Sequence, residues 1–329
     1  MFMTNQNNAK RSRVFFEASA RFVVLGAGVL VMGGLFGVAL FLVLQGWPAI
    51  TATSGLPRNA ANLWELAAPL AFGSVWAATI ALILAIPVAL SCALALTEYL
   101  PKQLSTTLGA VIDVLAAIPS VVYGLWGIMV LAPMLAGPYG WMGQNLGWIP
   151  LFAGEPSATG RTILTAGLVL AVMIMPIMTA ISREVFAQAP KELREASIAL
   201  GATKWEMIRM VVLPYGRSGM ISGAMLALGR ALGETMAVAM VLSAVPGLIS
   251  FELLTSSNPN TVAAFIAQNF PEAHGLEVSA LIALGLALFV ITFVVNGIAR
   301  KISNQPSDDA KPGLLARVKN AFVATGVRA

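Results

Sequence analysis

Long apolar runs separated by shorter polar segments dominate the chain. The first run covers residues 22–44 without a charged side chain, and a helix of that length rises about 34 Å, enough to cross a hydrocarbon core of about 30 Å. A cleaved signal peptide would have an apolar part of only about 7–15 residues, so the length favours an uncleaved anchor. The pattern predicts six transmembrane helices, the other five at residues 72–96, 108–135, 162–181, 218–244 and 276–299.

Three of these predicted spans contain a proline, at Pro87, Pro119 and Pro176. Proline has no N–H to donate, so each is expected to kink or locally unwind its helix. Membrane helices tolerate such breaks where neighbouring groups satisfy the freed carbonyls.

The composition excludes a soluble globular protein. Of the 329 residues, 58% are hydrophobic and 11% are charged, whereas soluble domains carry about 25% charged residues. The single cysteine, Cys92, lies inside an apolar run, so no disulfide framework exists. The chain is predicted to be an all-α membrane protein.

The distribution of Lys and Arg predicts the orientation of the spans. Seventeen of the twenty lie in the N-terminal segment, in the 97–107 and 182–217 loops or in the C-terminal tail. The alternate loops hold only Arg58 and Arg161. Positive residues remain on the cytoplasmic side, so both termini and the 182–217 loop are predicted to be cytoplasmic. Four tryptophans mark the predicted outer boundary: Trp47, Trp64, Trp141 and Trp148.

Two amphipathic segments lie outside the spans. Residues 261–270 (TVAAFIAQNF) predict a short helix in an outer loop, which is either simple loop structure or part of a platform for an extracytoplasmic partner. Residues 314–324 predict a helix that lies on the membrane surface.

The stretch of residues 190–214, PKELREASIALGATKWEMIRMVVLP, interrupts the apolar pattern. Pro190 suits the first position of a helix, because its missing N–H would be unpaired there. Leu193 and Leu200 recur at helical spacing against charged neighbours, and Gly201 stands where a left-handed residue ends a helix. The stretch therefore begins with a short amphipathic helix.

A second short helix is predicted directly after Gly201. Residues 203–206 have the S/T-x-x-E form of a capping box, and Trp205, Ile208 and Val212 mark an apolar face, with Pro214 expected to end the helix. Two such helices cannot span a bilayer, but they can lie flat on its cytoplasmic face. From the pattern alone, a solvated helical loop and a docking surface are both open.

The same stretch resembles the EAA loop of ABC importer permeases. The family pattern Glu-Ala-Ala-x3-Gly-x9-Ile-x-Leu-Pro is matched over residues 195–214 except at Ser197 and Val211, which are small changes of size. In that family the loop docks into a groove of the ATPase subunit. The resemblance assigns ATPase coupling to Glu195, Ala196, Gly201, Leu213 and Pro214.

Charged residues inside the predicted spans are costly, at about 2.5–3.5 kcal/mol each on insertion scales. Asp113 lies near the cytoplasmic end of its span and is expected to have a structural role. Arg230 lies about 18 Å into its span, too deep to reach the interface, and Glu234 follows four residues later. On one continuous helix the two share a face and are expected to pair.

The Arg230–Glu234 pair has two interpretations. It is either a packed ion pair that holds helices together or part of an anion pathway. Arginine presents a planar fork of donors that matches an oxyanion, and the nearby carboxylate keeps the anion from binding too tightly to be released. A lone arginine would favour a tighter anion site.

Three stretches resemble the PstC family of phosphate importer permeases: GRALGETMAV at residues 229–238, AIPSVVYGLWG at 117–127 and LFVITF at 288–293. The resemblance implies the six-helix, MetI-like fold of type I ABC importer permeases in the bacterial inner membrane. It also implies four partners: the sister permease PstA in a heterodimer, two copies of the ATPase PstB and the phosphate-binding protein PstS.

The resemblance links Arg230 and Glu234 to phosphate passage. Ser120 and Tyr123, beside Pro119, are weaker pathway candidates. The expected organisation is a cytoplasmic segment at residues 1–21, a first helix with its outer loop at 22–71, a permease core at 72–299 with the coupling loop at 190–214, and a tail at 300–329.

No G-x-x-x-x-G-K-[ST] motif occurs, so ATP hydrolysis is expected from a partner and not from this chain. No cofactor or metal is expected, since the single histidine, His274, lies in an outer loop without ligand companions. Two other functions remain open: a permease for sulfate, molybdate or tungstate, and a proton-coupled secondary transporter that uses Asp113, Arg230 and Glu234 as a relay.

Overall fold

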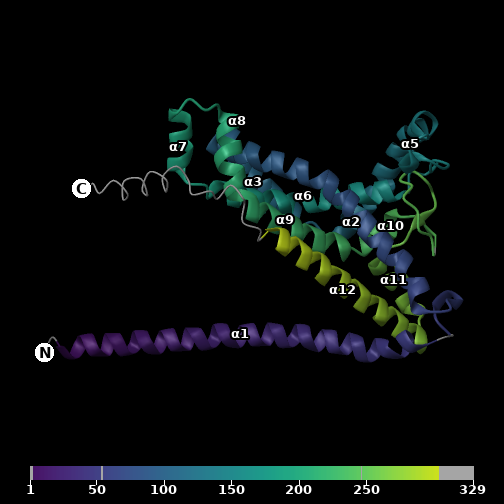
Figure 1. Ribbon diagram of the computed structural model, residues 1–329, viewed down its shortest axis with the longest axis horizontal. Helices are drawn as coiled ribbons and strands as arrows, with labels where there is room; N and C mark the ends of the chain where they lie inside the picture. The colour runs from purple at the N-terminus through teal and green to yellow at the C-terminus, as the bar shows by residue number, and fades with distance from the viewer. Residues whose placement is uncertain (1–2, 53–54, 246, 304–329) are drawn as a thin grey trace, which may run out of the picture.

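In the computed structural model the chain is described over residues 3–52, 55–245 and 247–303, and the helix predicted at 314–324 lies outside these ranges. The helices are α1 (Met3–Thr51), α2 (Leu63–Leu94), α3 (Lys102–Ala116), α4 (Ser120–Trp126), α5 (Ala132–Leu146), α6 (Ile163–Ala187), α7 (Lys191–Ala199), α8 (Lys204–Met207), α9 (Leu213–Leu232), α10 (Met236–Val241), α11 (Val262–Asn269) and α12 (Leu276–Ser303). Short 3₁₀ turns lie at Pro57–Asn59, Pro150–Phe152 and Phe270–Glu272, and π-helical turns at Ala95–Tyr99, Gly127–Leu131 and Ile208–Val212. Figure 1 shows α7 and α8 at one end of the helical bundle and α5, α11 and the α1–α2 junction at the other.

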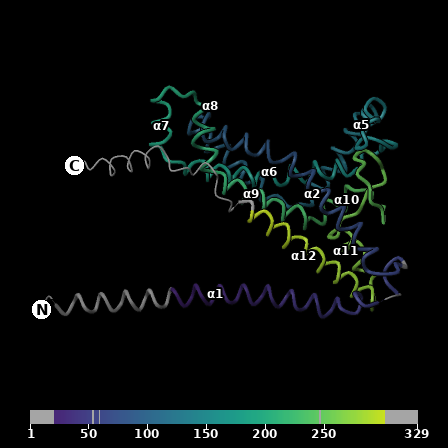
Figure 2. Tube along the Cα trace, viewed as in Figure 1, coloured from purple at the N-terminus to yellow at the C-terminus, as the bar shows by residue number. Residues whose placement is uncertain are grey.

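The first helix, α1, is longer than the predicted span. It runs unbroken for 49 residues, about 74 Å, through both the polar segment and the apolar run. The part of α1 that begins at Arg21 lies apart from the other helices over its first turns (Figures 1 and 2), and Phe22 is 80% exposed. Its C-terminal end crosses α12, where a Cβ added to Gly46 would lie 3.1 Å from Ala283 Cα. Glycine permits this close crossing.

The centre of the bundle is formed by α2, α6 and α9. Along α2, Ala77, Ala81, Ala85 and Ala89 recur every four residues and are almost completely buried. Small residues at this spacing let neighbouring helices approach closely, which is the main source of helix–helix contact where no hydrophobic effect operates. Gly167 of α6 lies against Ile80 for the same reason.

Proline breaks the helix at one of the three positions. The run predicted as one span at 108–135 is broken at residues 117–119, because Pro119 cannot donate a helical hydrogen bond and disfavours a helical residue before it. The boundaries of that predicted span are therefore wrong: the helix of spanning length is Ser120–Leu146, and α3 is a separate helix that packs on α6. Pro87 and Pro176 lie inside the continuous helices α2 and α6.

The run predicted at residues 218–244 is also divided. It is covered by α9 and α10, separated by a break at residues 233–235. In the described part of the chain, five helices are long and apolar enough to cross a membrane: Arg21–Thr51, Leu63–Tyr99, Ser120–Leu146, Ile163–Ala187 and Leu276–Lys301. A sixth crossing, built from α9 and α10 together, remains a prediction.

The segment between α10 and α11 folds back onto the bundle. Its two short strands, β1 (Ala244–Val245) and β2 (Asn258–Pro259), pair in parallel. The fully buried Asn258 side chain donates to the carbonyls of Arg161 and Ser243 and accepts from the N–H of Ile163, so one amide joins the segment to the start of α6. The predicted helix at 261–270 is present as α11, capped by Thr261.

Candidate functional site

Arg230 and Glu234 do not share a helix face. Helix α9 ends at Leu232, and Gly233 to Thr235 form the break before α10. The pairing expected from i, i+4 spacing is therefore wrong, because that spacing holds only along a continuous helix. Among the residues that the structure describes, ion pairs within 4.0 Å join Asp113 to Arg183 and Glu98 to Arg194, and none joins Arg230 to Glu234.

Glu234 instead caps the next helix. Its Oε1 accepts a hydrogen bond from the N–H of Ala237, 3.1 Å away, and the residue is buried with 9% exposure. The first N–H groups of a helix lack partners within it, and the helix dipole favours a negative charge there. The carboxylate therefore holds the break in place, while the Arg230 side chain on α9 remains exposed.

Tyr123 lies next to this break. The α4 backbone approaches α10 so closely that a Cβ on Gly124 would lie 2.9 Å from Ala237 Cα. The Tyr123 hydroxyl donates to the carbonyl of Leu115 at 2.9 Å, which gives this carbonyl beside the break at Pro119 a second partner besides the N–H of Ile118. Arg230 is near enough for its charge to act on the Tyr123 phenol. Ser120 is half-buried at the start of α4.

Arg230 continues an exposed face of α9 that the sequence analysis did not identify. Ser218, Ser222, Leu226 and Arg230 recur every four residues and are all exposed. The Ser222 hydroxyl donates to the carbonyl of Ser218, so it needs no external acceptor. The sequence alone could have indicated this face, because Ser218 and Ser222 precede Arg230 at multiples of four residues. A polar face of this kind at membrane depth is expected to meet water or protein and not lipid.

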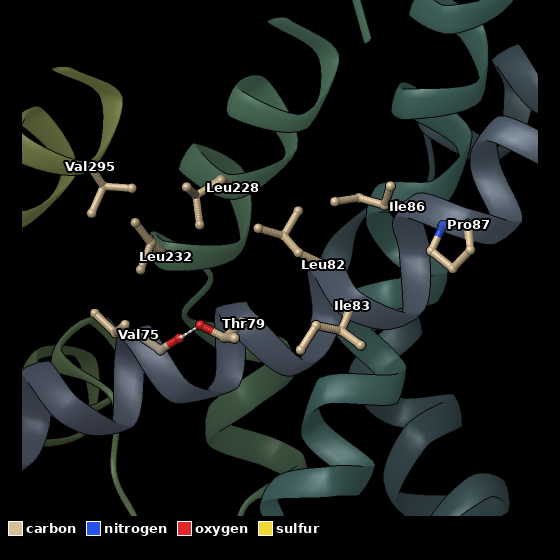
Figure 3. Close-up of a pocket in the computed structure, with 9 residues that line it drawn as sticks. All are labelled: Val75, Thr79, Leu82, Ile83, Ile86, Pro87, Leu228, Leu232 and Val295. Atoms are coloured by element: carbon tan, nitrogen blue, oxygen red, sulfur yellow. Dashed lines mark hydrogen bonds between the residues drawn. The ribbon is translucent and has the colours of Figure 1, made fainter. Parts of the chain in front are cut away.

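Two cavities of the bundle lie elsewhere and are mainly apolar. One of about 370 Å³ opens between α2, α9 and α12 (Figure 3), lined among others by Leu82, Ile86, Leu228 and Val295. The hydroxyl of Thr79, which also lines this cavity, donates to the carbonyl of Val75. A second, of about 390 Å³, lies between α11 and α12 beside Thr235 and is also lined mainly by apolar side chains. Neither offers the charged donors that an anion requires.

The stretch 190–214 contains the two predicted helices. Pro190 precedes α7 as its N-cap, one position earlier than predicted, and Gly201 adopts the left-handed conformation with φ of 88°. The expectation that Pro214 ends the second helix is wrong. The chain continues from α8 through the π turn at Ile208–Val212 into α9, with Pro214 in its first turn, where a missing N–H is tolerated.

The buried side chains of α7, α8 and the following turn match the predicted apolar faces only in part. Met207, Ile208 and Val212 are buried against the bundle, whereas Trp205 is 56% and Leu200 is 89% exposed. Glu195 and Ala196 are also exposed. Exposed apolar groups gathered on one short loop are typical of a protein interaction surface.

The predicted capping box at the start of α8 is present. The Thr203 hydroxyl accepts from the N–H of Glu206, and the Glu206 carboxylate accepts from the N–H of Thr203 at 2.7 Å. The hydrogen bonds from the Thr203 side chain and backbone favour the ionised carboxylate and hold the pKa of Glu206 below its usual value.

We expect this box to loosen in acid and in the variant Thr203→Ala. A lowered pKa in the folded protein means that the carboxylate stabilises the fold above the pKa of the unfolded chain, and that this contribution is lost as pH falls through the folded pKa. Thr203→Ala should accelerate amide exchange in residues 204–208 about fivefold at neutral pH. Hydrogen exchange followed by mass spectrometry, corrected for intrinsic rates, measures both effects; unchanged exchange would contradict a stabilising box.

Asp113 is placed as the structural interpretation predicted. Its Oδ2 lies 3.3 Å from Nη2 of Arg183 near the end of α6, and both side chains are partly exposed. A Cβ on Gly109 would collide with the Arg183 guanidinium, so this glycine makes room for the contact between α3 and α6. The contact of Asp113 with Arg183 joins α3 to α6, in keeping with a role in helix packing.

Comparison with known proteins identifies the class of membrane protein. Residues 85–305 match the family model described as "Binding-protein-dependent transport system inner membrane component". A relative from Mycobacterium tuberculosis (strain ATCC 25618 / H37Rv), named "Phosphate transport system permease protein PstC 2", is 44% identical over 312 residues, which are 90% of this chain and 93% of the relative.

Solved structures agree on the fold. A bacterial ABC transporter involved in the import of the acidic polysaccharide alginate aligns with a TM-score of 0.54 at 15% identity, covering 85% of this chain and 96% of that one. The inward-facing MetNI methionine ABC transporter aligns with a TM-score of 0.51 at 18% identity over 73% of this chain and 96% of that one. The predicted MetI-like fold is confirmed. With apolar helices of spanning length and this match over most of its length, the chain belongs to the family of inner membrane components of binding-protein-dependent transport systems, and within it to the PstC permeases.

Proposed function

We propose that this permease subunit moves inorganic phosphate across the bacterial inner membrane by alternating access. The observation that carries the proposal is the exposed guanidinium of Arg230, three residues before the helix break at 233–235, in a chain whose relatives are named phosphate permeases. A planar fork of donors matches a phosphate oxyanion. Without Glu234 as a partner, Arg230 keeps its donors available for the anion, and its exposure to solvent, in place of a paired carboxylate, keeps the attraction weak enough for release.

The pathway that we propose follows the exposed face of α9. Phosphate would meet Arg230 beside Tyr123 and then pass Ser222 and Ser218 toward the cytoplasm. Ser218 lies twelve residues before Arg230, about 18 Å along the helix, so this face covers much of the inner half of the membrane. Glu234 contributes by holding the break open at the N-terminus of α10, and Ser120 lies on the neighbouring helix.

The proposed energy source is an ATPase subunit that binds the exposed surface of α7 and α8. The coupling residues Glu195, Ala196 and Gly201 lie on or between these helices, and Leu213 and Pro214 begin α9, which carries Arg230. A push on the loop would therefore reach the anion site along one helix. We propose PstB as this ATPase, PstA as the sister permease and PstS as the phosphate donor, with both termini in the cytoplasm and the domain boundaries given above.

Transport of another oxyanion is the alternative. Sulfate, molybdate and tungstate also fit an arginine fork, and one guanidinium discriminates poorly among tetrahedral anions. A proton-coupled relay has less support, because Asp113 and Glu234 are held apart in contacts with Arg183 and Ala237.

Uptake of labelled phosphate into sealed right-side-out vesicles that carry this chain, PstA and PstB tests the proposal, with PstS added outside and ATP enclosed. We expect uptake that requires ATP and PstS, and that unlabelled phosphate abolishes while about a tenfold excess of sulfate does not, because specificity is a difference of affinities. Uptake that proceeds without the ATPase, or that sulfate displaces equally well, would contradict the assignment.

A further inference from the structure

One arginine of the coupling stretch points back toward the membrane helices. The Arg194 side chain on α7 is only 19% exposed, although Lys191, Glu192 and Glu195 on the same helix are exposed. Its Nη1 lies 2.8 Å from Oε1 of Glu98, and its Nη2 donates to the carbonyl of Phe186. One guanidinium thus joins α7 to the ends of two membrane helices.

The partner carboxylate is even more deeply placed. The Glu98 side chain is 5% exposed and lies in the π turn Ala95–Tyr99 that ends α2. An ion pair taken out of water adds little net stability, and removal of one partner leaves the other charge buried and uncompensated. Such a pair is better suited to fixing the position of α7 relative to α2 than to holding the fold together. Turns of π-helix occur frequently at functional sites.

The second helix of the coupling stretch contacts the same end of α2. Nζ of Lys204 on α8 lies 4.8 Å from the centre of the Tyr99 ring, one residue beyond Glu98. Below it, Met207 and Ile208 are buried in a cluster with Ala93 of α2. Both α7 and α8 therefore rest on α2, in addition to their chain connections to α6 and α9.

At its opposite end α2 holds the segment between α10 and α11. The Ser74 hydroxyl accepts from the N–H of Val262 at 2.9 Å, and the Phe251 ring lies 4.9 Å from that of Phe72 and 5.4 Å from that of Trp76. Ser74 and Glu98 are 24 residues apart, about 36 Å along the helix. Figure 1 shows α2 running from the α8 end of the bundle to the α10–α11 end.

We infer that the Arg194–Glu98 ion pair transmits the movement of the coupling stretch to α2, and through α2 to the segment of residues 244–262 on the opposite side of the membrane. Arg194 and Glu98 are positioning residues: they touch neither the anion nor ATP. The inference rests on the proposed function for the source of the movement. The ion pair links α7 directly to α2, whereas the polypeptide connects α7 only to α6 and α8.

The test uses the complete transporter in vesicles with Cys92→Ser as background and Ser256→Cys as a reporter in the exposed part of the 244–262 segment. Three quantities are measured: ATP hydrolysis, phosphate uptake and the rate at which a membrane-impermeant maleimide labels the reporter with and without ATP. Glu98→Gln and Arg194→Gln are compared with Lys191→Gln, a matched change on the exposed side of α7.

We expect Glu98→Gln and Arg194→Gln to keep ATP hydrolysis but to lose the ATP-dependent change in labelling, with roughly tenfold less phosphate moved per ATP. Lys191→Gln should behave as the background, and the exchange Glu98→Arg with Arg194→Glu should restore much of the ratio. If the ATP-dependent change in labelling persists in Glu98→Gln and Arg194→Gln, or if these variants lose assembly and hydrolysis together with uptake, the pair is structural and the inference is wrong. If the transporter does not take up phosphate but its labelling response to ATP still depends on the pair, the phosphate assignment is wrong and the inference about Arg194 and Glu98 stands.

Discussion

Phosphate uptake by Arg230→Gln should fall about 10- to 100-fold at unchanged assembly and unchanged binding of the ATPase. Glutamine is polar but shorter than arginine and has no charge, and a hydrogen bond to a charged group contributes about 1.5–3 kcal/mol. Because Arg230 is exposed and has no carboxylate partner within 4.0 Å among the described residues, its loss should not uncover a buried charge. Uptake of labelled phosphate, normalised to the amount of assembled complex, measures the effect.

Two variants separate the role of the guanidinium from a general loss of charge. Arg230→Lys keeps the charge without the planar fork and should retain intermediate uptake. Arg217→Gln is the same substitution on the same helix, at an exposed position thirteen residues earlier and on the other side of α9, and should leave uptake nearly unchanged. Normal transport by Arg230→Gln would place the pathway elsewhere and make Arg230 a structural residue.

The spans were predictable to different degrees because hydropathy reports burial in lipid and not backbone continuity. The apolar run at 162–181 corresponds to the single helix α6, whose ends are set by the Thr162 cap and Gln188. The run at 108–135 is apolar on both sides of Pro119 except at Asp113, so hydropathy alone does not show that the crossing begins at Ser120 and extends to Leu146. Pro119 indicates the position of the break better than hydropathy does.

The site was predicted in its residues but not in its geometry. Arg230 was recognisable because a charge at that depth must have a reason. Its separation from Glu234 depends on the backbone at Gly233, and a glycine in a glycine-rich membrane helix is not by itself evidence of a break. The Arg194–Glu98 contact joins residues 96 positions apart, so no local pattern could reveal it, and Glu98 was not considered.

The variant Glu195→Lys tests the coupling surface most directly. Glu195 is exposed on α7 beside Ala196, close to the exposed apolar side chains of the loop, and it makes no ion pair within 4.0 Å in the described residues. If the ATPase groove that receives this surface is positively charged opposite Glu195, reversal of the charge brings like charges together in the contact, which costs several kcal/mol. ATP-dependent uptake should fall at least about tenfold, while folding of the permease is retained.

Glu184→Lys is the matched control, because it makes the same charge reversal at an exposed position of α6 on the same side of the membrane and outside the coupling stretch. It should transport at nearly the normal rate. Co-purification of the ATPase shows whether Glu195→Lys weakens binding or only coupling, and either result supports a docking surface at α7. Normal uptake by Glu195→Lys would contradict a docking surface at α7, because a docked surface should not tolerate a reversed charge. An equal loss in Glu184→Lys would also contradict it, because the loss would then follow from charge at that membrane face and not from contact with α7.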